Sequence, residues 1–283
     1  MRVTKIFPVL LGTLGVHAAL PAASAAISAK ADLVGEVFGL PITNSMVTSW
    51  AVSLLIIAAV RLMVGVPKLV PNRGQAVVEN LVEGIFNLIQ PITGKAASKA
   101  AFPLLIGLFT FILIHNWSGL FPGVGTIGTH DAHGHFIPYI RPGNADLNGT
   151  AALAIVSMIA WFYLIFKYAG IKVIAFDLFG NKANKKDVPS ALYYLLFIVF
   201  GAVGFIEIIS IIFRPISLSF RLFGNVFGGE NLLHAMTGLF KWGLPIPFYF
   251  LELLIGFVQA LVFTLLVSVY IGLICNHGDE EHH

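Results

Sequence analysis

The sequence predicts an all-α integral membrane protein with about five membrane-embedded helices, one amphipathic surface helix, and a long tilted hairpin formed by the last two helices. Of its 283 residues, 57% are hydrophobic and 11% are charged, whereas soluble domains carry about 25% charged residues. Several apolar runs reach the roughly 20 residues that a membrane-spanning helix needs. The single cysteine, Cys275, excludes an intramolecular disulfide and a multi-cysteine metal site.

The first 25 residues have the pattern of a secretory signal peptide. Arg2 and Lys5 precede the apolar stretch Phe7–Leu20, and Ala23-Ser24-Ala25 then supplies small residues for cleavage. A first membrane helix is the alternative, but the apolar stretch is short for a span. We therefore expect cleavage after this segment (residues 1–25), an N-terminus outside the cytoplasm, and a single polytopic membrane domain over residues 26–283.

Four elements are expected before the longest apolar run. Residues 45–66, 101–121 and 149–166 are apolar enough to span the membrane. Residues 75–90 differ, because their apolar side chains recur at helical spacing with polar side chains opposite. These apolar residues are Val77, Val78, Leu81, Val82, Ile85, Phe86 and Ile89. The pattern predicts an amphipathic helix on the membrane surface or against a partner.

The last two apolar runs cover residues 188–240 and 248–275. The first would form a helix of roughly 75 Å at 1.5 Å per residue, whereas the hydrocarbon core is about 30 Å thick. It is therefore either two upright helices or one steeply tilted helix. A tilted helix paired with the final run keeps the C-terminus in the cytoplasm, and we favour that arrangement.

Basic residues predict the orientation. Those that follow the first span and those between residues 167 and 186 fall on one side if each span crosses once, and the opposite side has only Arg141 and Lys241. By the positive-inside rule, the lysine-rich side is cytoplasmic. The net charge of +3 follows this topology, and without an aromatic and basic patch it gives no reason to expect nucleic acid as a partner.

Ionisable residues interrupt the longest apolar run. A guanidinium at bilayer depth costs about 2.5–3.5 kcal/mol on insertion scales and cannot lose its proton. Glu207, Arg214 and Arg221 are spaced seven residues apart on one helical stripe, and Glu230 lies roughly 180° around the helix from Arg221. Snorkelling of Arg221 to the interface is the alternative, but this residue is far from either end. The run therefore faces protein or water, and its ionisable groups indicate an ion pathway.

The final run carries a second polar stripe, because Glu252, Gln259 and Tyr270 share one helical face. A carboxylate, an amide and a phenol in a row supply oxygens that can exchange protons or coordinate a cation. Tyr270 as an interface anchor and Gln259 as a helix–helix contact are the alternatives. An unpartnered buried carboxylate is costly, so a purely structural Glu252 is disfavoured.

The loop from 122 to 148 contains three histidines and an aspartate close together. His130, Asp131, His133 and His135 could ligate a metal. They lie in a glycine-rich loop without a fixed scaffold, so a solvated loop is favoured and no metal site is expected.

Residues 217–230 resemble subunit a of the F-type ATP synthase membrane sector, with Arg-Leu-Phe-Gly-Asn at 221–225 and a glutamate nine residues after the arginine. Pro215 upstream, and Gln259 and Tyr270 in the last helix, extend the match. Residues 145–148 and 115–122 are similar to the family as well, so the resemblance covers most of the chain from about residue 35.

The resemblance implies a stator subunit in the bacterial cell inner (plasma) membrane, with a cytoplasmic C-terminus, no catalytic site of its own and no cofactor. Its implied partners are the c-ring proteolipid subunits, the peripheral-stalk b subunits, the soluble ATPase sector of the whole complex, and the lipid bilayer. Two offset half-channels reach the c-ring from opposite sides, and Arg221 matches the essential arginine between them. Its fixed charge favours the ionised form of an arriving c-ring carboxylate, so the bound ion leaves.

The family also implies which residues line each half-channel. The residues that match the outer half-channel are Asn225, Glu230, Glu252 and Gln259, with Asn116, Asp146 and Asn148 near its mouth. The residues that match the cytoplasmic half-channel are Glu207, Ser210, Arg214, Ser217 and Tyr270.

The chain departs from the family at one pair of positions. Many relatives combine the glutamate at position 230 with a histidine at position 252, whereas both residues are glutamate here. Two nearby carboxylates repel each other when both are ionised, so the pair is expected to share a proton or hold a cation. The coupling ion can therefore be H⁺ or Na⁺, and the choice is expected to depend mainly on the c-ring.

Two other functions compete with the stator subunit. A self-contained secondary transporter would also carry ionisable residues at the membrane midplane, but transporters often contain internal repeats, and no convincing repeat relates the two halves of this chain. An intramembrane metalloenzyme that uses His130, His133 and His135 lacks ligands on a span.

Overall fold

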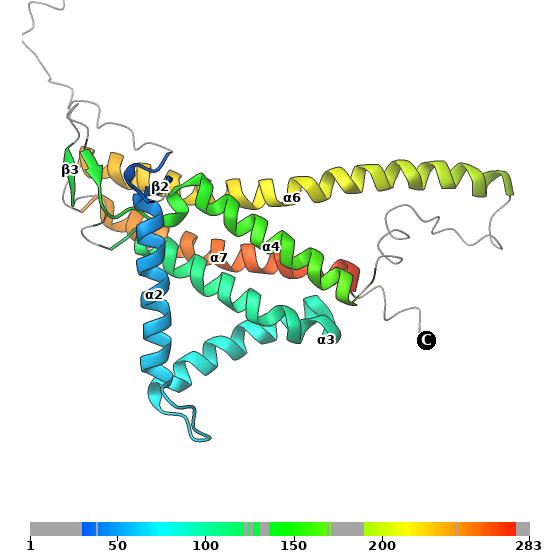
Figure 1. Cartoon of the computed structure of the whole chain (residues 1–283), viewed down its shortest axis with the longest axis horizontal. Coiled ribbons are helices and arrows are strands. Elements are labelled where there is room, and N and C mark those ends of the chain that lie inside the picture. The colour runs from blue at the N-terminus through cyan, green and yellow to red at the C-terminus, as the bar shows by residue number, and fades with distance from the viewer. Residues whose placement is uncertain are drawn as a thin grey trace, which may run out of the picture.

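The computed structural model describes residues 30–37, 39–121, 124, 127–130, 136–168, 170, 190–240 and 243–275, and it is built almost entirely of helices (Figure 1). The longer helices are α2 (Asn44–Val64), α3 (Arg73–Ser118), α4 (Leu147–Tyr168), α6 (Ser190–Leu239) and α7 (Pro245–Cys275), and a short 3₁₀ helix, η1, covers Gly143–Ala145. Within this part of the chain, five helices are long and apolar enough to cross a membrane. The predicted all-α membrane class is confirmed.

Local sequence signals fix both ends of α2 and the start of α3. Thr43 caps α2, with its side-chain oxygen accepting from the backbone N–H of Met46. The helix ends at Gly65, whose φ of 60° disfavours residues with a side chain. Asn72 then caps α3 by accepting from the backbone N–H of Gln75 at 2.7 Å.

Helix α3 contains both the amphipathic segment and the second span. Gly94 has a φ of 77° and kinks the helix, so its two arms form a V that opens toward α2 (Figure 1). The second arm is the apolar one, and Ala97–Ser118 is long enough to span. In the first arm, Ile85 and Ile89 are buried in the core while Glu79 and Glu83 lie away from it.

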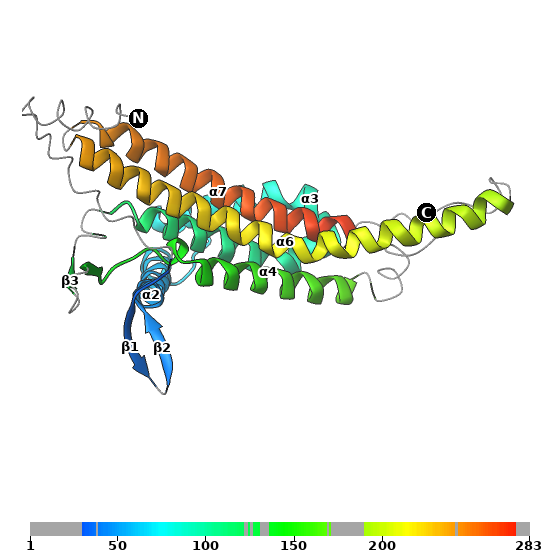
Figure 2. The same ribbon diagram turned by 90° about the horizontal axis from the view of Figure 1, so that it is seen from above.

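Helices α6 and α7 form the long hairpin, lying side by side and crosswise to α2 (Figures 1 and 2). Helix α6 is continuous over 50 residues, with Pro215 inside it, so the alternative of two upright helices is excluded. Its N-terminal part extends beyond the other helices (Figure 1). If α2 crosses the bilayer upright, α6 and α7 are steeply tilted.

A single apolar core joins α3, α4, α6 and α7. Its largest fully buried side chains include Phe109 on α3, Ile165 on α4, Leu222 on α6 and Phe263 on α7. Helix α7 packs most extensively on α3, and α6 packs on α4 and α7. The core therefore fixes the polar residues of α6 and α7 relative to α3.

Two short β-hairpins lie at the end of the molecule where α2 begins, and the sequence analysis did not predict them. Strand β1 (Leu33–Val37) pairs antiparallel with β2 (Leu40–Thr43), and β3 (Gly128–His130) with β4 (Phe136–Pro138). Asn44, at the start of α2, donates from Nδ2 to the carbonyl oxygen of Pro138 at 2.8 Å. This bond connects the start of α2 to the second hairpin.

Several expectations concern residues outside the described ranges. These are the signal peptide at 1–25, residues 131–135 of the histidine-containing loop, the lysine-rich segment from 171 to 186 and the C-terminal tail after Cys275. They stay predictions.

Candidate functional site

The predicted site residues fall into two polar groups along α6 and α7, with Arg221 between them. The two helices are antiparallel neighbours, so the C-terminal part of α6 lies beside the N-terminal part of α7. Glu230 and Glu252 therefore belong to one end of the hairpin, and Glu207 and Tyr270 to the other. We call these ends the outer group and the inner group.

The outer group begins one turn from Arg221. Asn225 on α6 donates from Nδ2 to Oε1 of Gln259 on α7 at 2.7 Å. Gln259 is only 5% exposed, and its Nε2 is buried without a hydrogen-bond partner among the described residues. This amide pair bridges the two helices inside the membrane and leaves one donor available to water or to an ion's hydration shell.

Glu230 on α6 and Glu252 on α7 belong to facing turns of neighbouring helices, because Glu252 lies against Gly229. The Glu252 carboxylate fills the space where a side chain at Gly229 would stand, so the residue before Glu230 must be small. Arg141 and His234 lie close enough for their charges to act on Glu230. Its Oε2 is buried and finds no hydrogen-bond partner in the described part of the chain. The structure thus places Glu252 against the turn of α6 that carries Glu230, and the sharing of a proton or a cation by the two carboxylates stays a prediction.

Asn116 connects α3 to this site. It donates from Nδ2 to the carbonyl oxygen of Gly256 on α7 at 2.9 Å, and its Oδ1 accepts from Asn144 on η1 at 2.8 Å. The indole of neighbouring Trp117 donates to the carbonyl oxygen of Leu253 at 3.1 Å. Both α7 carbonyls lie within one turn of Glu252, so α3 determines where this carboxylate sits.

Asp146 is the centre of the predicted mouth. It is 4% exposed, and its Oδ2 accepts from the Ser45 hydroxyl on α2 at 3.1 Å. Its Oδ1 accepts from the backbone N–H of Asn148 at 3.2 Å. One turn later, Thr150 and Ser219 share a hydrogen bond of 3.2 Å between α4 and α6. This last contact ties the start of α4 to α6 two residues before Arg221.

The inner group is organised by Arg214. Its Nη2 pairs with Oε1 of Glu207 at 2.6 Å, and its guanidinium lies 4.6 Å from the ring centre of Tyr270 and 5.7 Å from that of Trp161. The Trp161 indole donates to the Tyr270 carbonyl oxygen at 2.7 Å. Glu207, Arg214 and Tyr270 are therefore in one cluster, which joins α4, α6 and α7.

Arg221 lies between the two groups along α6 and contacts neither of them in the described part of the chain. Its side chain is exposed, and it makes no hydrogen bond or ion pair with any residue that the structure describes. Ser210, Ser217, Gly224 and Gly228 are exposed on the same helix at spacings of three, four or seven residues. Neither glycine has anything within 4 Å of an added Cβ. An exposed cation on a spanning helix disfavours contact with lipid, and small residues beside it permit the close approach of another helix.

Three residues near the outer group were not singled out by sequence reasoning. Arg141 was counted only as a loop residue, but it is 3% exposed and donates from Nη1 to the carbonyl oxygen of Lys30 at 2.8 Å. Asn144 had no recognisable signal. His115 is fully buried at the end of α3, and its place beside Asn116 was the one available indication.

No metal centre is apparent in the described part of the chain, where no three His, Cys, Asp or Glu side chains come together. His133 and His135 lie outside this part, so the prediction that their loop binds no metal is untested.

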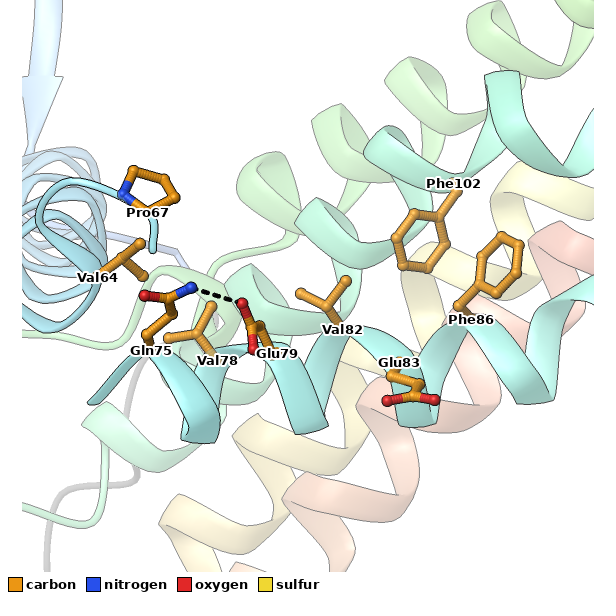
Figure 3. A pocket seen from close by; sticks show the side chains of 9 residues that line it. All are labelled: Val64, Pro67, Gln75, Val78, Glu79, Val82, Glu83, Phe86 and Phe102. Carbon is orange, nitrogen blue, oxygen red and sulfur yellow. Dashed lines mark hydrogen bonds between the residues drawn. The ribbon is translucent and has the colours of Figure 1, made fainter. Parts of the chain in front are cut away.

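A cavity of about 600 Å³ lies away from both polar groups, between the end of α2 and the first arm of α3 (Figure 3). Its wall is mainly apolar, and the rings of Phe86 and Phe102 meet edge to face with centres 5.1 Å apart. Glu79 accepts a hydrogen bond from Gln75 at 2.7 Å at its rim. None of the predicted site residues lines this cavity.

The fold and the two polar groups define a class, namely a multi-pass membrane protein with ionisable residues held inside its spans. Residues 46–272 match the protein family described as ATP synthase A chain. The chain is also 31% identical, over 228 residues, to the ATP synthase subunit a of Trichlorobacter lovleyi. The aligned region covers 81% of this chain and 85% of that protein.

The chain belongs to the ATP synthase A chain family. The resemblance inferred from residues 217–230 is confirmed at the level of the family.

Proposed function

We propose that the chain is the ion-translocating stator subunit of an F-type ATP synthase and forms two offset half-channels against a c-ring. The observation that carries the proposal is the position of Arg221, exposed on α6 between two polar groups at opposite ends of one hairpin. An ion that enters through one group cannot reach the other without passing this fixed positive charge. It travels instead on a ring carboxylate, whose rotation is coupled to ATP synthesis.

The proposal includes an orientation. The outer group lies at the end of the molecule where α2 begins, and the basic residues Arg61 and Lys68 lie at or beyond the other end of α2. With the positive-inside rule, this supports an N-terminus outside a bacterial inner membrane and a C-terminus in the cytoplasm. The c-ring, the b subunits and the soluble ATPase sector are then the partners.

The first experiment is purification of the chain from its native membrane, followed by ATP-driven transport in vesicles with and without Na⁺ and an uncoupler. We expect a small ring-forming proteolipid and a soluble ATPase to copurify, and the uncoupler to collapse the gradient without any need for Na⁺. Transport that depends on Na⁺ and resists the uncoupler would identify Na⁺ as the coupling ion. Ion transport by the isolated chain alone would instead favour the secondary transporter.

The carboxylate pair gives a prediction about flux. Glu230→Gln and Glu252→Gln should each slow ATP-driven pumping by about tenfold or more, because each removes a group that can take up and release the ion. Passive leak should not rise, since Arg221 still separates the half-channels. The measurement is pumping and leak in vesicles with equal amounts of assembled complex.

Glu83→Gln is the matched control for this pair, because Glu83 lines the distant cavity and touches neither polar group. It should leave pumping unchanged. Normal pumping in both Glu230→Gln and Glu252→Gln would show that the outer half-channel runs elsewhere.

A further inference from the structure

His115 is a buried histidine. Its position is explained neither by the packing described above nor by the proposed half-channels. It lies in the last turn of α3 and is 0% exposed. Neither Nδ1 nor Nε2 has a hydrogen-bond partner among the residues that the structure describes. The ring of Phe111 lies beside it, with ring centres 4.1 Å apart. A buried histidine that serves only packing normally donates or accepts at least one hydrogen bond.

The surroundings of His115 connect it to the mouth at Asp146. A Cβ added to Gly143 on η1 would overlap the Ser49 hydroxyl and would stand 3.2 Å from Nδ1 of His115, so both groups border the same glycine. The Ser49 hydroxyl donates to the carbonyl oxygen of Ser45 at 2.8 Å, and the Ser45 hydroxyl donates to Asp146. Asp146, Ser45, Ser49 and His115 therefore all lie around η1.

The residue that follows His115 contacts α7 close to Glu252. The next residue, Asn116, binds Asn144 and the backbone of α7 one turn after Glu252. Glu230 Oε2 and Gln259 Nε2, farther along the outer group, are also buried without partners in the described chain. Buried polar atoms without protein partners are satisfied by water, so water is expected beside His115, Gln259 and Glu230.

We propose that His115 is a proton-relay residue of the outer half-channel, between the mouth at Asp146 and the pair Glu230 and Glu252. The inference rests on the proposed function and adds the proton as the ion that passes this point. A proton from water on the outer side forms an N–H bond at the free ring nitrogen and gives an imidazolium. One N–H bond then breaks as the proton passes to water or to a carboxylate oxygen further in, and the ring is neutral again.

Charged and polar groups surround this part of the fold on several elements. Asp146 and Arg141 adjoin η1, and α2 presents the hydroxyls of Ser45 and Ser49. Glu252 lies one turn before the α7 carbonyl that binds Asn116, and Glu230 on α6 lies near enough to Arg141 for their charges to interact. An imidazole has two ring nitrogens, so it can accept a proton at one nitrogen and release a proton from the other.

The test is ATP synthesis by the whole complex in vesicles, driven by an imposed potential and by a variable pH on the outer side. His115→Gln keeps a polar side chain but cannot carry a proton. We expect its rate to fall by about tenfold or more and its dependence on outer pH to flatten. Phe111→Leu, which disturbs packing on the same ring, should leave the pH dependence of the wild type.

A second variant separates proton transfer from packing. His115→Ala should be slow, and added imidazole should restore synthesis, whereas pyrazole, of the same size but far less basic, should not. Equal rescue by both rings, or a His115→Gln enzyme with the wild-type rate and pH dependence, would overturn the relay. Arg221→Ala, measured in parallel, reports on the proposed function itself. If Arg221→Ala abolishes coupling while His115→Gln keeps the wild-type rate and pH dependence, the relay proposal is wrong and the proposed function still stands.

Discussion

Replacing Arg221 by alanine is expected to abolish coupled ATP synthesis and ATP-driven ion pumping, while passive ion leak stays the same or increases. Arg221 is exposed on α6 and has no partner within the described chain, so its charge is available to a ring carboxylate. Without that charge, the ionised form of an arriving carboxylate is less stabilised, so the carboxylate keeps its bound ion. Ions could also pass directly between the half-channels, and the membrane potential, about 2.3 kcal/mol per charge per 100 mV, would be dissipated.

The measurement is pumping, synthesis and leak in vesicles that contain equal amounts of assembled complex. Arg61→Ala provides the matched control, because Arg61 is also exposed on a spanning helix but lies on α2, away from both polar groups. The control should pump normally. An Arg221→Ala complex that still pumps at the wild-type rate would show that the charge gate is not at this position.

The helices were predictable because hydropathy depends on local composition. An apolar run of sufficient length has to become a span, and α2, α4 and α7 follow the predicted runs closely. The kink at Gly94 was not predictable, because a single glycine inside a helical pattern is usually tolerated. It allows the amphipathic and spanning arms of α3 to meet in one helix.

The site was predictable only in part. Helical spacing placed Glu207 and Arg214 on one stripe, and the structure pairs them at 2.6 Å. The contact between Asn225 and Gln259 depends on how α6 and α7 lie beside each other, which no spacing within one helix reveals. His115 and Arg141 were missed for a similar reason, because only the packing of η1 against α2 and α3 buries them.

Gly272→Val is expected to prevent α7 from docking on α3, and thus to remove the subunit from the assembled complex. A Cβ at Gly272 would overlap the carbonyl oxygen of Ile92, and the carbonyl carbon of Ile92 and the Cα of Thr93 lie within 3.4 Å of it. All three atoms are backbone beside the kink at Gly94, so they cannot move aside as a side chain could. Overpacking of this kind costs typically about 1–3 kcal/mol and more when backbone must shift.

The appropriate comparison is Gly107→Val in α3, where an added Cβ meets nothing within 4 Å. The same substitution in a spanning helix should leave assembly intact, because the new side chain extends into open space. Both variants should be followed by the amount of complex recovered from the membrane and by its thermal stability in detergent. Since α3 positions Asn116 against α7 beside Glu252, any Gly272→Val complex that does assemble should also pump slowly. Normal recovery and normal pumping would mean that α7 does not seat on the kink of α3 as this packing requires.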